Sequence, residues 1–246
     1  MDFMWNSIEK EISPKISFIV PCYNEEKLVG PLLNKLYEAT QRYFPASEII
    51  VVNDGSTDQS GSVLKPFADR PGFLVIHHPA NRGKGASIRS ALEKCTGSIV
   101  VIQDADHEYD PADLPELIAP ILEQRADVVY GSRFLSGKPK RALYLLHAWG
   151  NRFLTTLTNL LTGLTLTDME TGYKAIRKEI LTNLSLRENR FGFEPELTMK
   201  LARIKNIRFY EVGISYYGRS FQEGKKIHWK DGLHALYCLF KYRFFS

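Results

Sequence analysis

Residues 99–106, Ile-Val-Val-Ile-Gln-Asp-Ala-Asp, constrain the fold more than any other part of the chain. They begin as an apolar run and end in two carboxylates, Asp104 and Asp106, one residue apart. A short apolar run of this kind predicts a strand buried in a parallel sheet whose two faces are covered by helices. Open sheets of this class bind ligands at the carboxyl ends of their strands. Two acids at that edge are costly to bury unless a positive group, such as a hard divalent cation, lies between them.

The composition is that of an ordinary globular domain. The 246 residues are 44% hydrophobic and 24% charged, which is enough to bury one large core. The net charge of +4 does not indicate a nucleic-acid-binding protein. Cys22, Cys95 and Cys238 are widely spaced, so we expect reduced, buried thiols rather than disulfides or a zinc site. The sequence has neither a signal-peptide pattern nor an apolar run of membrane-spanning length, and we expect a cytoplasmic protein.

Apolar runs that favour strands alternate with segments of helical spacing. This alternation predicts right-handed βαβ units, and hence a Rossmann-like α/β fold with a mostly parallel central sheet flanked by helices. We expect one such domain over residues 1–219. Residues 220–246 are expected to add a basic loop and an amphipathic helix, as an extension and not as a separate domain. The predicted strands are residues 16–20, 48–52, 73–77, 98–102, 127–131 and 207–214.

Two later helices are amphipathic, and their apolar faces have two interpretations. Residues 145–164 carry an apolar stripe at helical spacing, and the final helix mixes aromatic side chains with lysines and arginines. Aromatic and basic side chains together suit the headgroup region of an anionic membrane. The same pattern is equally typical of a helix that packs on a core and exposes a basic edge.

The first two predicted strands end in polar turns that open at the same edge as the two acids. The first turn contains Pro21, Tyr23 and Glu25, and the second begins with Asn53, Asp54 and a glycine. Asp54 is placed to accept hydrogen bonds from the base or ribose of a nucleotide. The sequence Asp-Gly-Ser-Thr-Asp is about as common in a simple turn followed by a helix cap.

Residues 81–85, Asn-Arg-Gly-Lys-Gly, precede a predicted helix over residues 86–94. Two glycines and two bases before a helix suit an anion, because free backbone N–H groups and the helix dipole both favour negative charge. We assign Lys84 to the binding of such a ligand. The spacing is not that of a Walker A loop, and a glycine-rich turn with solvated bases is the other interpretation.

The acidic segment continues beyond the strand as Asp104-Ala-Asp106-His-Glu108. Residues two apart on an extended chain point the same way, so Asp104 and Asp106 can share one cation, and Glu108 can complete its ligands. Oxygen ligands favour Mg²⁺ or Mn²⁺ over zinc. The alternative is a solvated acidic loop that caps the helix beginning near Pro111, although a buried strand rarely ends in two acids without a cause.

Taken in order, these segments resemble one enzyme family. The motifs that begin at residues 21, 53, 81, 104 and 131 are similar to those of family 2 glycosyltransferases of the GT-A fold, most of all to the dolichyl-phosphate mannose synthase-like branch. The resemblance runs from about Ile16 to Arg219. It implies that three groups of residues form the site. Pro21, Tyr23, Glu25 and Asp54 would hold the nucleotide, Asp104, Asp106 and Glu108 the metal, and Arg133 a donor or acceptor phosphate.

Two further motifs resemble the same branch. Residues 168–174, Asp-Met-Glu-Thr-Gly-Tyr-Lys, match its acceptor motif, which places Asp168 and Lys174 near the acceptor, with Asp168 as a base or an orienting group. A turn before a helix at Ala175 is the alternative. In the motif that follows, Glu194 is a weaker candidate to face the donor sugar.

The basic segment over residues 219–226 resembles a loop that closes over the diphosphate in these synthases. The resemblance implies that Arg219 and Lys225 neutralise charge on the donor and lipid phosphates. The glycine and the bases of this segment suit a lid that orders when substrate binds. A solvated surface loop is the competing interpretation.

The reaction implied by the resemblance is a metal-dependent, inverting transfer of a hexose from a nucleotide-diphosphate sugar, of GDP-mannose or UDP-glucose type, to a polyprenyl or dolichyl monophosphate. A phosphate oxygen is already anionic at neutral pH, so positioning and charge neutralisation would carry the catalysis. The expected catalytic residues are Asp106, Arg133, Asp168 and Arg219. We expect the protein to lie peripherally on the cytoplasmic face of a membrane, and the sequence does not determine its oligomeric state.

The main alternative keeps the donor site and changes the acceptor to a hydroxyl of a saccharide, a protein or a glycerolipid. A hydroxyl must lose its proton, which would make a general base such as Asp168 or Glu194 indispensable. A non-catalytic nucleotide-sugar-binding protein is less consistent with the acids and bases together. A nicotinamide dehydrogenase is disfavoured because no G-x-G-x-x-G follows the first strand.

Overall fold

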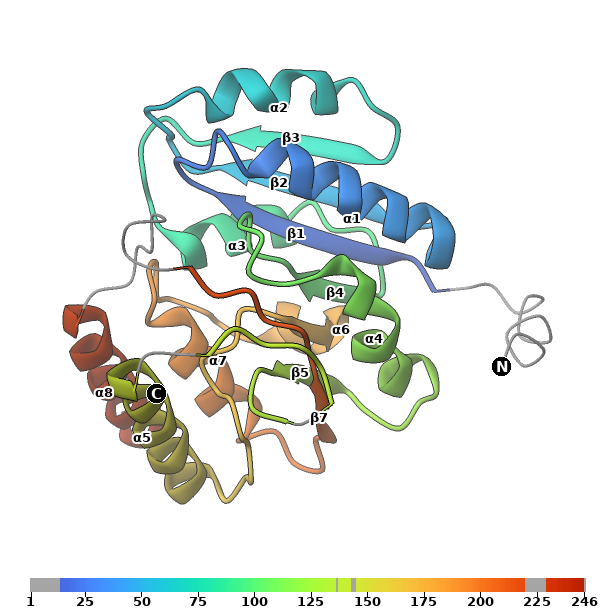
Figure 1. Cartoon of the computed structure of the whole chain (residues 1–246). Helices are drawn as coiled ribbons and strands as arrows, with labels where there is room; N and C mark the ends of the chain where they lie inside the picture. Colours follow the sequence, from blue (N-terminus) through green and yellow to red (C-terminus); the bar gives the residue numbers. More distant parts are fainter. Residues whose placement is uncertain (1–13, 136, 143–144, 220–228, 246) are drawn as a thin grey trace.

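The seven-stranded sheet at the centre of the protein is parallel except for one strand. The computed structural model describes residues 14–135, 137–142, 145–219 and 229–245, and its strands lie in the order β3-β2-β1-β4-β6-β5-β7 (Figure 1). Strand β6 is antiparallel to both of its neighbours, and the other neighbouring pairs are parallel. The strands are β1 (Ile16–Cys22), β2 (Glu48–Asn53), β3 (Phe73–His77), β4 (Ile99–Ile102), β5 (Val128–Ser132), β6 (Lys174–Arg177) and β7 (Phe209–Gly213).

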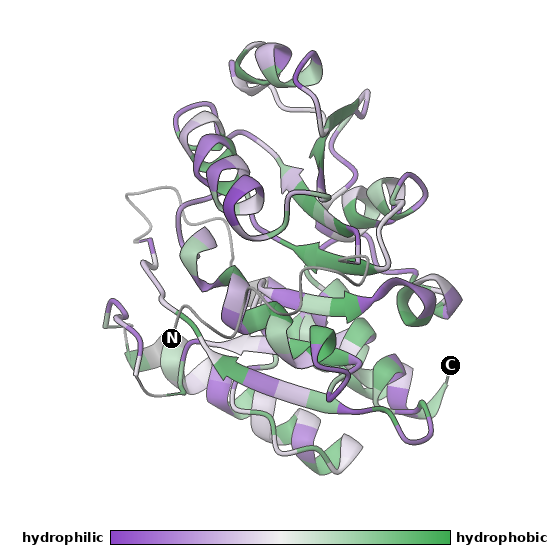
Figure 2. Cartoon of the chain, turned by 90° about the vertical axis from the view of Figure 1, so that its right-hand side faces the viewer, coloured by the Kyte–Doolittle hydropathy of each residue, from purple (hydrophilic) through white to green (hydrophobic). Residues whose placement is uncertain are grey.

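Helices cover both faces of the sheet, and the apolar strands lie between them (Figure 2). Successive residues of a strand point to opposite faces. In β1, Phe18 and Val20 pack with α1, α2 and α4, whereas Ile19 faces α3 and the later helices. The predicted α/β class, with a mostly parallel central sheet flanked by helices, is confirmed. The helices are α1 (Val29–Tyr43), α2 (Ser60–Ala68), α3 (Lys84–Leu92), α4 (Leu114–Leu122), α5 (Leu145–Thr162), α6 (Lys178–Asn183), α7 (Phe193–Leu201) and α8 (Trp229–Phe244), with a 3₁₀ turn, η1 (Pro111–Asp113), before α4.

Strand β6 lies where the alternative interpretation of residues 168–174 places a helix. It pairs with β4 on one side and with β5 on the other, and α6 begins only at Lys178. The facing sides of β4 and β5 carry backbone N–H and C=O groups that need hydrogen-bond partners. A strand between them supplies these partners, whereas a helix does not. The alternative interpretation of residues 168–174, a turn before a helix at Ala175, is therefore wrong, because pairing with two distant strands overrides the local preference of these residues.

Helix α8 has one face in the core and one in solvent. Cys238, Leu239 and Tyr242 are fully buried, in the core cluster to which α7 and α5 also contribute, whereas Tyr237 and Phe240 are exposed. The buried side of α8 agrees with the interpretation of a core-packing helix. Its exposed aromatic side is compatible with the interpretation of a membrane-facing helix. None of the helices in the described part of the chain is long and apolar enough to cross a membrane. The boundary at residue 219 between domain and extension stays a prediction.

Candidate active site

A cavity of about 510 Å³ lies at the carboxyl edge of the sheet, where the segments after β1, β2 and β4 meet the start of α3. Its wall contains most of the residues predicted to bind the donor, together with Asp106. Arg133 and Glu108 do not line this cavity, and Lys225 lies outside the described residues. The predicted residues that line it are Pro21, Tyr23, Glu25, Asp54, Lys84, Asp104, Asp106 and Arg219.

Asp104 is compensated by a lysine from the first turn of α3. The Nζ of Lys84 lies 2.7 Å from Oδ1 of Asp104 and 2.8 Å from Oε1 of Glu194, which α7 contributes. Burial favours the neutral amine, but the two carboxylates outweigh it and hold the pKa of Lys84 well above its usual range. Lys84 is therefore a permanent cation that joins α3, β4 and α7 at the cavity.

Asp106 is compensated by Arg219, which follows β7. One guanidinium nitrogen of Arg219 donates to Oδ2 of Asp106 at 2.6 Å, and a second lies 3.1 Å from both carboxylate oxygens of Glu25. The Nε of Arg219 is 3.5 Å from Oε1 of Glu108. Burial and the neighbouring Glu108 and Asp104 raise the pKa of Asp106 to about 7, and Arg219 opposes that rise.

The acids at this edge fit a hard divalent cation. Asp104 and Asp106 come from the segment after β4 and face the same cavity, with Glu25 and Glu108 joined to them through Arg219. Carboxylate oxygens are the ligands that Mg²⁺ and Mn²⁺ take, and several carboxylates this deep require positive charge. The structure provides that charge from side chains, so the same oxygens are already arranged around cations.

Asp54 orders the loop that carries Lys84. Its Oδ1 lies 2.7 Å from Nδ1 of His78 and accepts from the N–H of Arg82 at 3.0 Å, while Oδ2 accepts from the N–H of Gly83 at 2.7 Å. Gly83 has a φ of +98°, and a Cβ there would lie 2.4 Å from the carbonyl oxygen of Asn189, so this position requires glycine. Asp54 therefore lines the cavity and also holds the backbone of the loop at Arg82 and Gly83 in place.

Arg133 and Asp168 form a buried ion pair beside this cavity. Nε and Nη2 of Arg133 donate to the two carboxylate oxygens of Asp168 at 2.6 and 2.7 Å, and the N–H of Arg133 donates at 3.0 Å. Asn151 of α5 adds a fourth hydrogen bond at 3.0 Å. Arg133 holds the pKa of Asp168 below its usual range in spite of burial. Asp168 is thus a poor general base and serves to orient Arg133.

The loop before β6 connects this ion pair to Asp104. A Cβ on Gly172 would lie 2.0 Å from Oδ2 of Asp104, so the backbone of the loop rests directly against that carboxylate. The N–H of Gly172 donates to the hydroxyl of Tyr109 at 2.9 Å. Lys174, which the resemblance places near the acceptor, is buried instead, and its Nζ donates to the carbonyl oxygens of Met169 and Thr171. Its expected contact with the acceptor is wrong, because the lysine ties the loop to β6.

Some residues that shape the site belong to no recognisable motif of the sequence. Asn151 lies on an apolar helix, and His78 has no ligand spacing. Tyr216 donates to Oε2 of Glu108 at 2.9 Å, and the N–H of Arg219 donates to Oε1 at 3.0 Å. Glu108, predicted as a metal ligand, thus also anchors the segment that carries Arg219.

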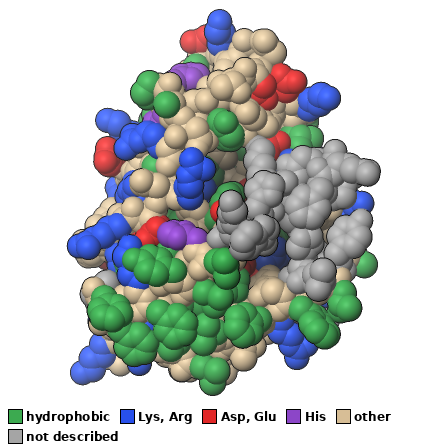
Figure 3. Space-filling model, turned by 90° about the vertical axis from the view of Figure 1, so that its left-hand side faces the viewer, with side chains coloured by type: hydrophobic (Ala, Val, Ile, Leu, Met, Phe, Trp, Pro, Cys, Tyr) green, Lys and Arg blue, Asp and Glu red, His purple; other side chains and the backbone are tan. Residues whose placement is uncertain are grey.

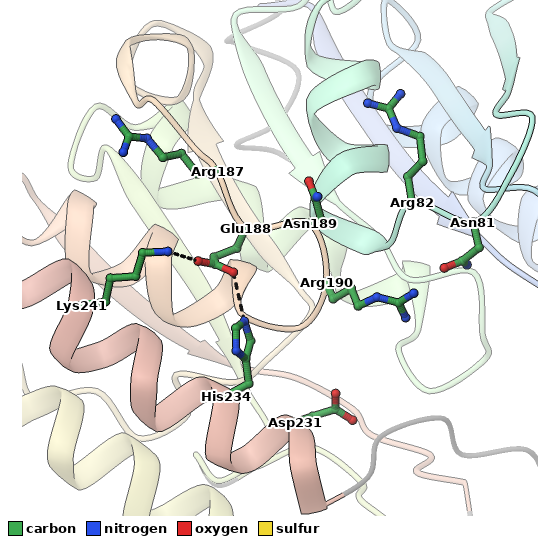
Figure 4. Close-up of a pocket in the computed structure, with 9 residues that line it drawn as sticks. All are labelled: Asn81, Arg82, Arg187, Glu188, Asn189, Arg190, Asp231, His234 and Lys241. Atoms are coloured by element: carbon green, nitrogen blue, oxygen red, sulfur yellow. Dashed lines mark hydrogen bonds and ion pairs between the residues drawn. The ribbon is translucent and has the colours of Figure 1, made fainter.

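A second, open cavity of about 710 Å³ lies beside α8, and two residues of its wall, Glu188 and His234, belong with Cys238 to a cluster of metal-ligand type (Figure 4). The ligand atoms of Glu188, His234 and Cys238 lie within 4.8 Å of one another. Glu188 is already paired with Lys241 at 2.8 Å and accepts from Tyr242 at 2.7 Å. Burial raises the pKa of the Cys238 thiol to about 12, which favours the protonated thiol in this packing. This cluster packs α8 against the loop before α7.

Acids and bases gathered at the carboxyl edge of a mostly parallel sheet are the arrangement expected of an enzyme that binds a phosphorylated ligand through a cation. The sequence matches the model of glycosyl transferase family 2 over residues 17–184, and the chain belongs to that family. The resemblance stated from the motifs is thereby confirmed, and the protein is a glycosyltransferase.

Two similar proteins are named as enzymes that transfer a sugar to a polyprenyl phosphate. The chain is 30% identical to the UDP-N-acetylglucosamine–dolichyl-phosphate N-acetylglucosaminyltransferase of Methanococcus voltae over 194 residues, which is 72% of this chain and 75% of the relative. It is 30% identical to the undecaprenyl-phosphate 4-deoxy-4-formamido-L-arabinose transferase of Pseudomonas savastanoi pv. phaseolicola over 190 residues. That match covers 76% of this chain and 55% of the relative, so the chain spans about half of that longer protein.

The fold is shared with a solved enzyme. The glucosyl-3-phosphoglycerate synthase of Mycobacterium tuberculosis, in complex with Mn²⁺, UDP-glucose and phosphoglyceric acid, superposes with a TM-score of 0.70 over 94% of this chain and 80% of that chain. The two sequences are 20% identical, so the likeness concerns the fold.

Gly172→Ala tests whether the loop before β6 positions Asp104. The added Cβ displaces the Asp104 carboxylate, so we expect the affinity for Mn²⁺, measured with a nucleoside diphosphate by titration calorimetry, to fall at least about tenfold. Gly150→Ala on α5, where a Cβ meets nothing within 4 Å, is the matched control and leaves the affinity unchanged. Equal affinities in the two variants would contradict the assigned contact.

Asp168→Asn tests the buried ion pair. Removing the charge leaves the Arg133 guanidinium buried without its partner, which costs about 3–5 kcal/mol of the free energy of unfolding. Urea denaturation measures this loss. Glu123→Gln removes one partner of an exposed pair and changes the free energy of unfolding by less than about 0.5 kcal/mol. A loss below about 1 kcal/mol in Asp168→Asn would show that the pair does not stabilise the fold.

Proposed function

We propose that the protein moves a hexose, with inversion, from a nucleotide-diphosphate sugar to a polyprenyl monophosphate, with Mg²⁺ or Mn²⁺ as the cofactor. The observation that carries this proposal is the cavity in which Asp104 and Asp106 lie beside Lys84 and Arg219. Such a site suits a diphosphate held by a divalent cation and two bases. The family membership and the named activities of the two relatives support it.

The residues of the chain have distinct roles in the proposed reaction. The segments with Pro21, Tyr23 and Asp54 bind the nucleoside. Asp104 and Asp106 would hold the cation, which would supply positive charge to the leaving diphosphate. An oxygen of the acceptor phosphate attacks C1 of the sugar from the face opposite the diphosphate. The C1–O bond breaks, and its electron pair leaves with the nucleoside diphosphate. Arg219 neutralises the diphosphate, and Arg133, oriented by Asp168, holds the acceptor phosphate.

An acceptor phosphate is favoured over an acceptor hydroxyl by the state of the candidate bases. Asp168 accepts four hydrogen bonds, and Arg133 lowers its pKa. Glu194 is paired with Lys84 at 2.8 Å. A hydroxyl acceptor needs a base that can take a proton, whereas a phosphate oxygen needs only positioning and positive charge.

Asp106→Ala tests the role of the acid cluster in turnover. We expect transfer from UDP-glucose or GDP-mannose to undecaprenyl phosphate, measured with Mn²⁺ by mass spectrometry, to fall at least about 10²–10³-fold, because the cation loses a ligand and Arg219 an ion-pair partner.

The control for this variant is Asp69→Ala, which removes an exposed carboxylate and retains full activity. Circular dichroism and thermal unfolding are expected to show that Asp106→Ala remains folded. Cation-dependent transfer at the wild-type rate in Asp106→Ala would contradict the assignment of this cavity.

We also propose that the exposed face of α5 and α8 rests on the lipid surface that holds the acceptor, at the cytoplasmic side of a membrane. Trp149 and Phe153 of α5 are 65% and 58% exposed, and Tyr237 and Phe240 of α8 are 58% and 45% exposed. Apolar side chains gather over this end of the molecule, with basic side chains around them (Figure 3). An apolar patch bordered by bases suits an anionic lipid surface.

The surroundings of this face agree with such a partner. Arg187, Arg190 and Lys241 line the second cavity, beside the exposed edge of α8 (Figure 4). Their positive charge would meet lipid phosphates while the aromatic side chains enter the headgroup region. Three buried, free cysteines suit the reducing compartment in which we place the protein.

The double variant Phe153→Asp/Phe240→Asp tests the lipid-facing surface. Replacing two aromatic side chains by carboxylates removes apolar contact and adds repulsion from anionic lipid, so binding to phosphatidylglycerol vesicles should weaken at least tenfold in a sedimentation assay. Tyr43→Asp changes an exposed aromatic residue of α1 and should leave binding unchanged. Unaltered vesicle binding in the double variant would contradict this surface.

A further inference from the structure

One arginine joins acids from two separate loops of the site. The guanidinium of Arg219 lies 2.6 Å from Oδ2 of Asp106, 3.1 Å from both carboxylate oxygens of Glu25 and 3.5 Å from Oε1 of Glu108. Its side chain is 15% exposed, and the three carboxylates are 9–14% exposed. Burial of these charges is tolerable only because they compensate one another.

The carboxylate oxygen that Arg219 contacts most closely is one that a divalent cation would use. Oδ1 of Asp106 accepts the N–H of Glu108 at 3.2 Å, and Oδ2 accepts from Arg219. A cation on Asp106 would therefore share its ligand with a guanidinium and lie next to a like charge. The guanidinium and a metal ion would compete for this oxygen of Asp106.

The backbone around Arg219 is held in place independently of this side chain. The N–H groups of Tyr217 and Arg219 donate to the backbone and side-chain oxygens of Glu108 at 2.9 and 3.0 Å. Arg141 donates to the carbonyl oxygen of Gly218 at 3.0 Å. A fixed backbone with a long, flexible side chain lets the guanidinium move by several ångströms while it stays at the cavity.

We propose that Arg219 takes the place of the divalent cation while the donor is absent and moves to the donor diphosphate when metal and nucleotide bind. This inference rests on the proposed function. Metal alone must displace Arg219 from Asp106 and leaves the arginine only Glu25 and Glu108, with no new anion in exchange. Metal with a diphosphate provides both a cation for the carboxylates and an anion for Arg219. The two ligands therefore bind cooperatively, and Arg219 is the residue that couples them.

The coupling is measured from the affinity for Mn²⁺ in titrations of the full chain, without nucleotide and with saturating UDP or GDP. Wild-type protein is expected to bind Mn²⁺ at least tenfold more tightly with one of these nucleotides than without. In Arg219→Gln, we expect the affinity for Mn²⁺ alone to rise at least fivefold and the effect of the nucleotide to shrink at least fivefold.

Two further variants make the experiment specific. Arg141→Gln loosens the same segment without removing a charge from the carboxylates, and the coupling should stay within twofold of wild type. Arg219→Lys keeps the charge but has no planar group to contact three carboxylates, and the coupling should fall at least threefold. If Arg219→Gln does not fold, Arg219→Lys decides the question.

Unchanged or weaker binding of Mn²⁺ alone by Arg219→Gln would overturn the inference, as would unchanged coupling in Arg219→Lys. An equal loss of coupling in Arg141→Gln would also overturn it, because the order of the segment, and not the guanidinium, would then be responsible. A wild-type protein that binds neither nucleotide with Mn²⁺ would contradict the proposed function itself and this inference with it.

Discussion

Carboxylates buried at the ends of β1 and β4 are the constraint on which the rest of the site depends. Asp104, Asp106, Glu108 and Glu25 have side chains less than a quarter exposed, and carboxylates removed from water require positive charge close by. Lys84 at the start of α3 and Arg219 after β7 supply that charge from segments far apart in the sequence. The edge of the sheet is thus held together by ion pairs as well as by the apolar layers behind it. A site assembled in this way already has the electrostatics that a cation and a diphosphate would use.

Two further carboxylates, Asp54 and Asp168, act by positioning basic residues of the site. Asp54 accepts from the backbone of Arg82 and Gly83 and so fixes the loop that presents Lys84. Asp168 accepts from Arg133 at three points and fixes the direction of its guanidinium. In both cases the acid acts on the geometry of a base, and hydrogen bonds of this charge-assisted kind are the strong ones. Positioning is therefore distributed over groups that need not touch a substrate.

The parts of the site that follow directly from a strand could be predicted from the sequence, and the parts that depend on contacts between distant segments could not. An apolar run ending in Asp104 and Asp106 predicts a buried strand whose carboxyl end lies at the binding edge of a mostly parallel sheet. The pairing of Arg133 with Asp168 joins residues 35 positions apart, and no local pattern connects them. Lys174 was misplaced for the same reason: a strand inserted between β4 and β5 takes its side chain into the interior. Residues of the same type and spacing can either line a cavity or be buried beneath it. The order and direction of the strands determine which of the two occurs.

Helix α5 connects the two halves of the proposed function. Its inner side carries Asn151, which donates to Asp168, and its outer side carries the exposed Trp149 and Phe153. A polyprenyl phosphate keeps its chain in the membrane and its phosphate at the surface. In the proposed arrangement, α5 would rest on that surface and, through Asn151 and Asp168, would set the depth at which the Arg133 guanidinium meets the phosphate. The acceptor would then reach the site without leaving the lipid. This is favourable because moving its chain from lipid into water would cost about 0.8 kcal/mol per CH₂ group.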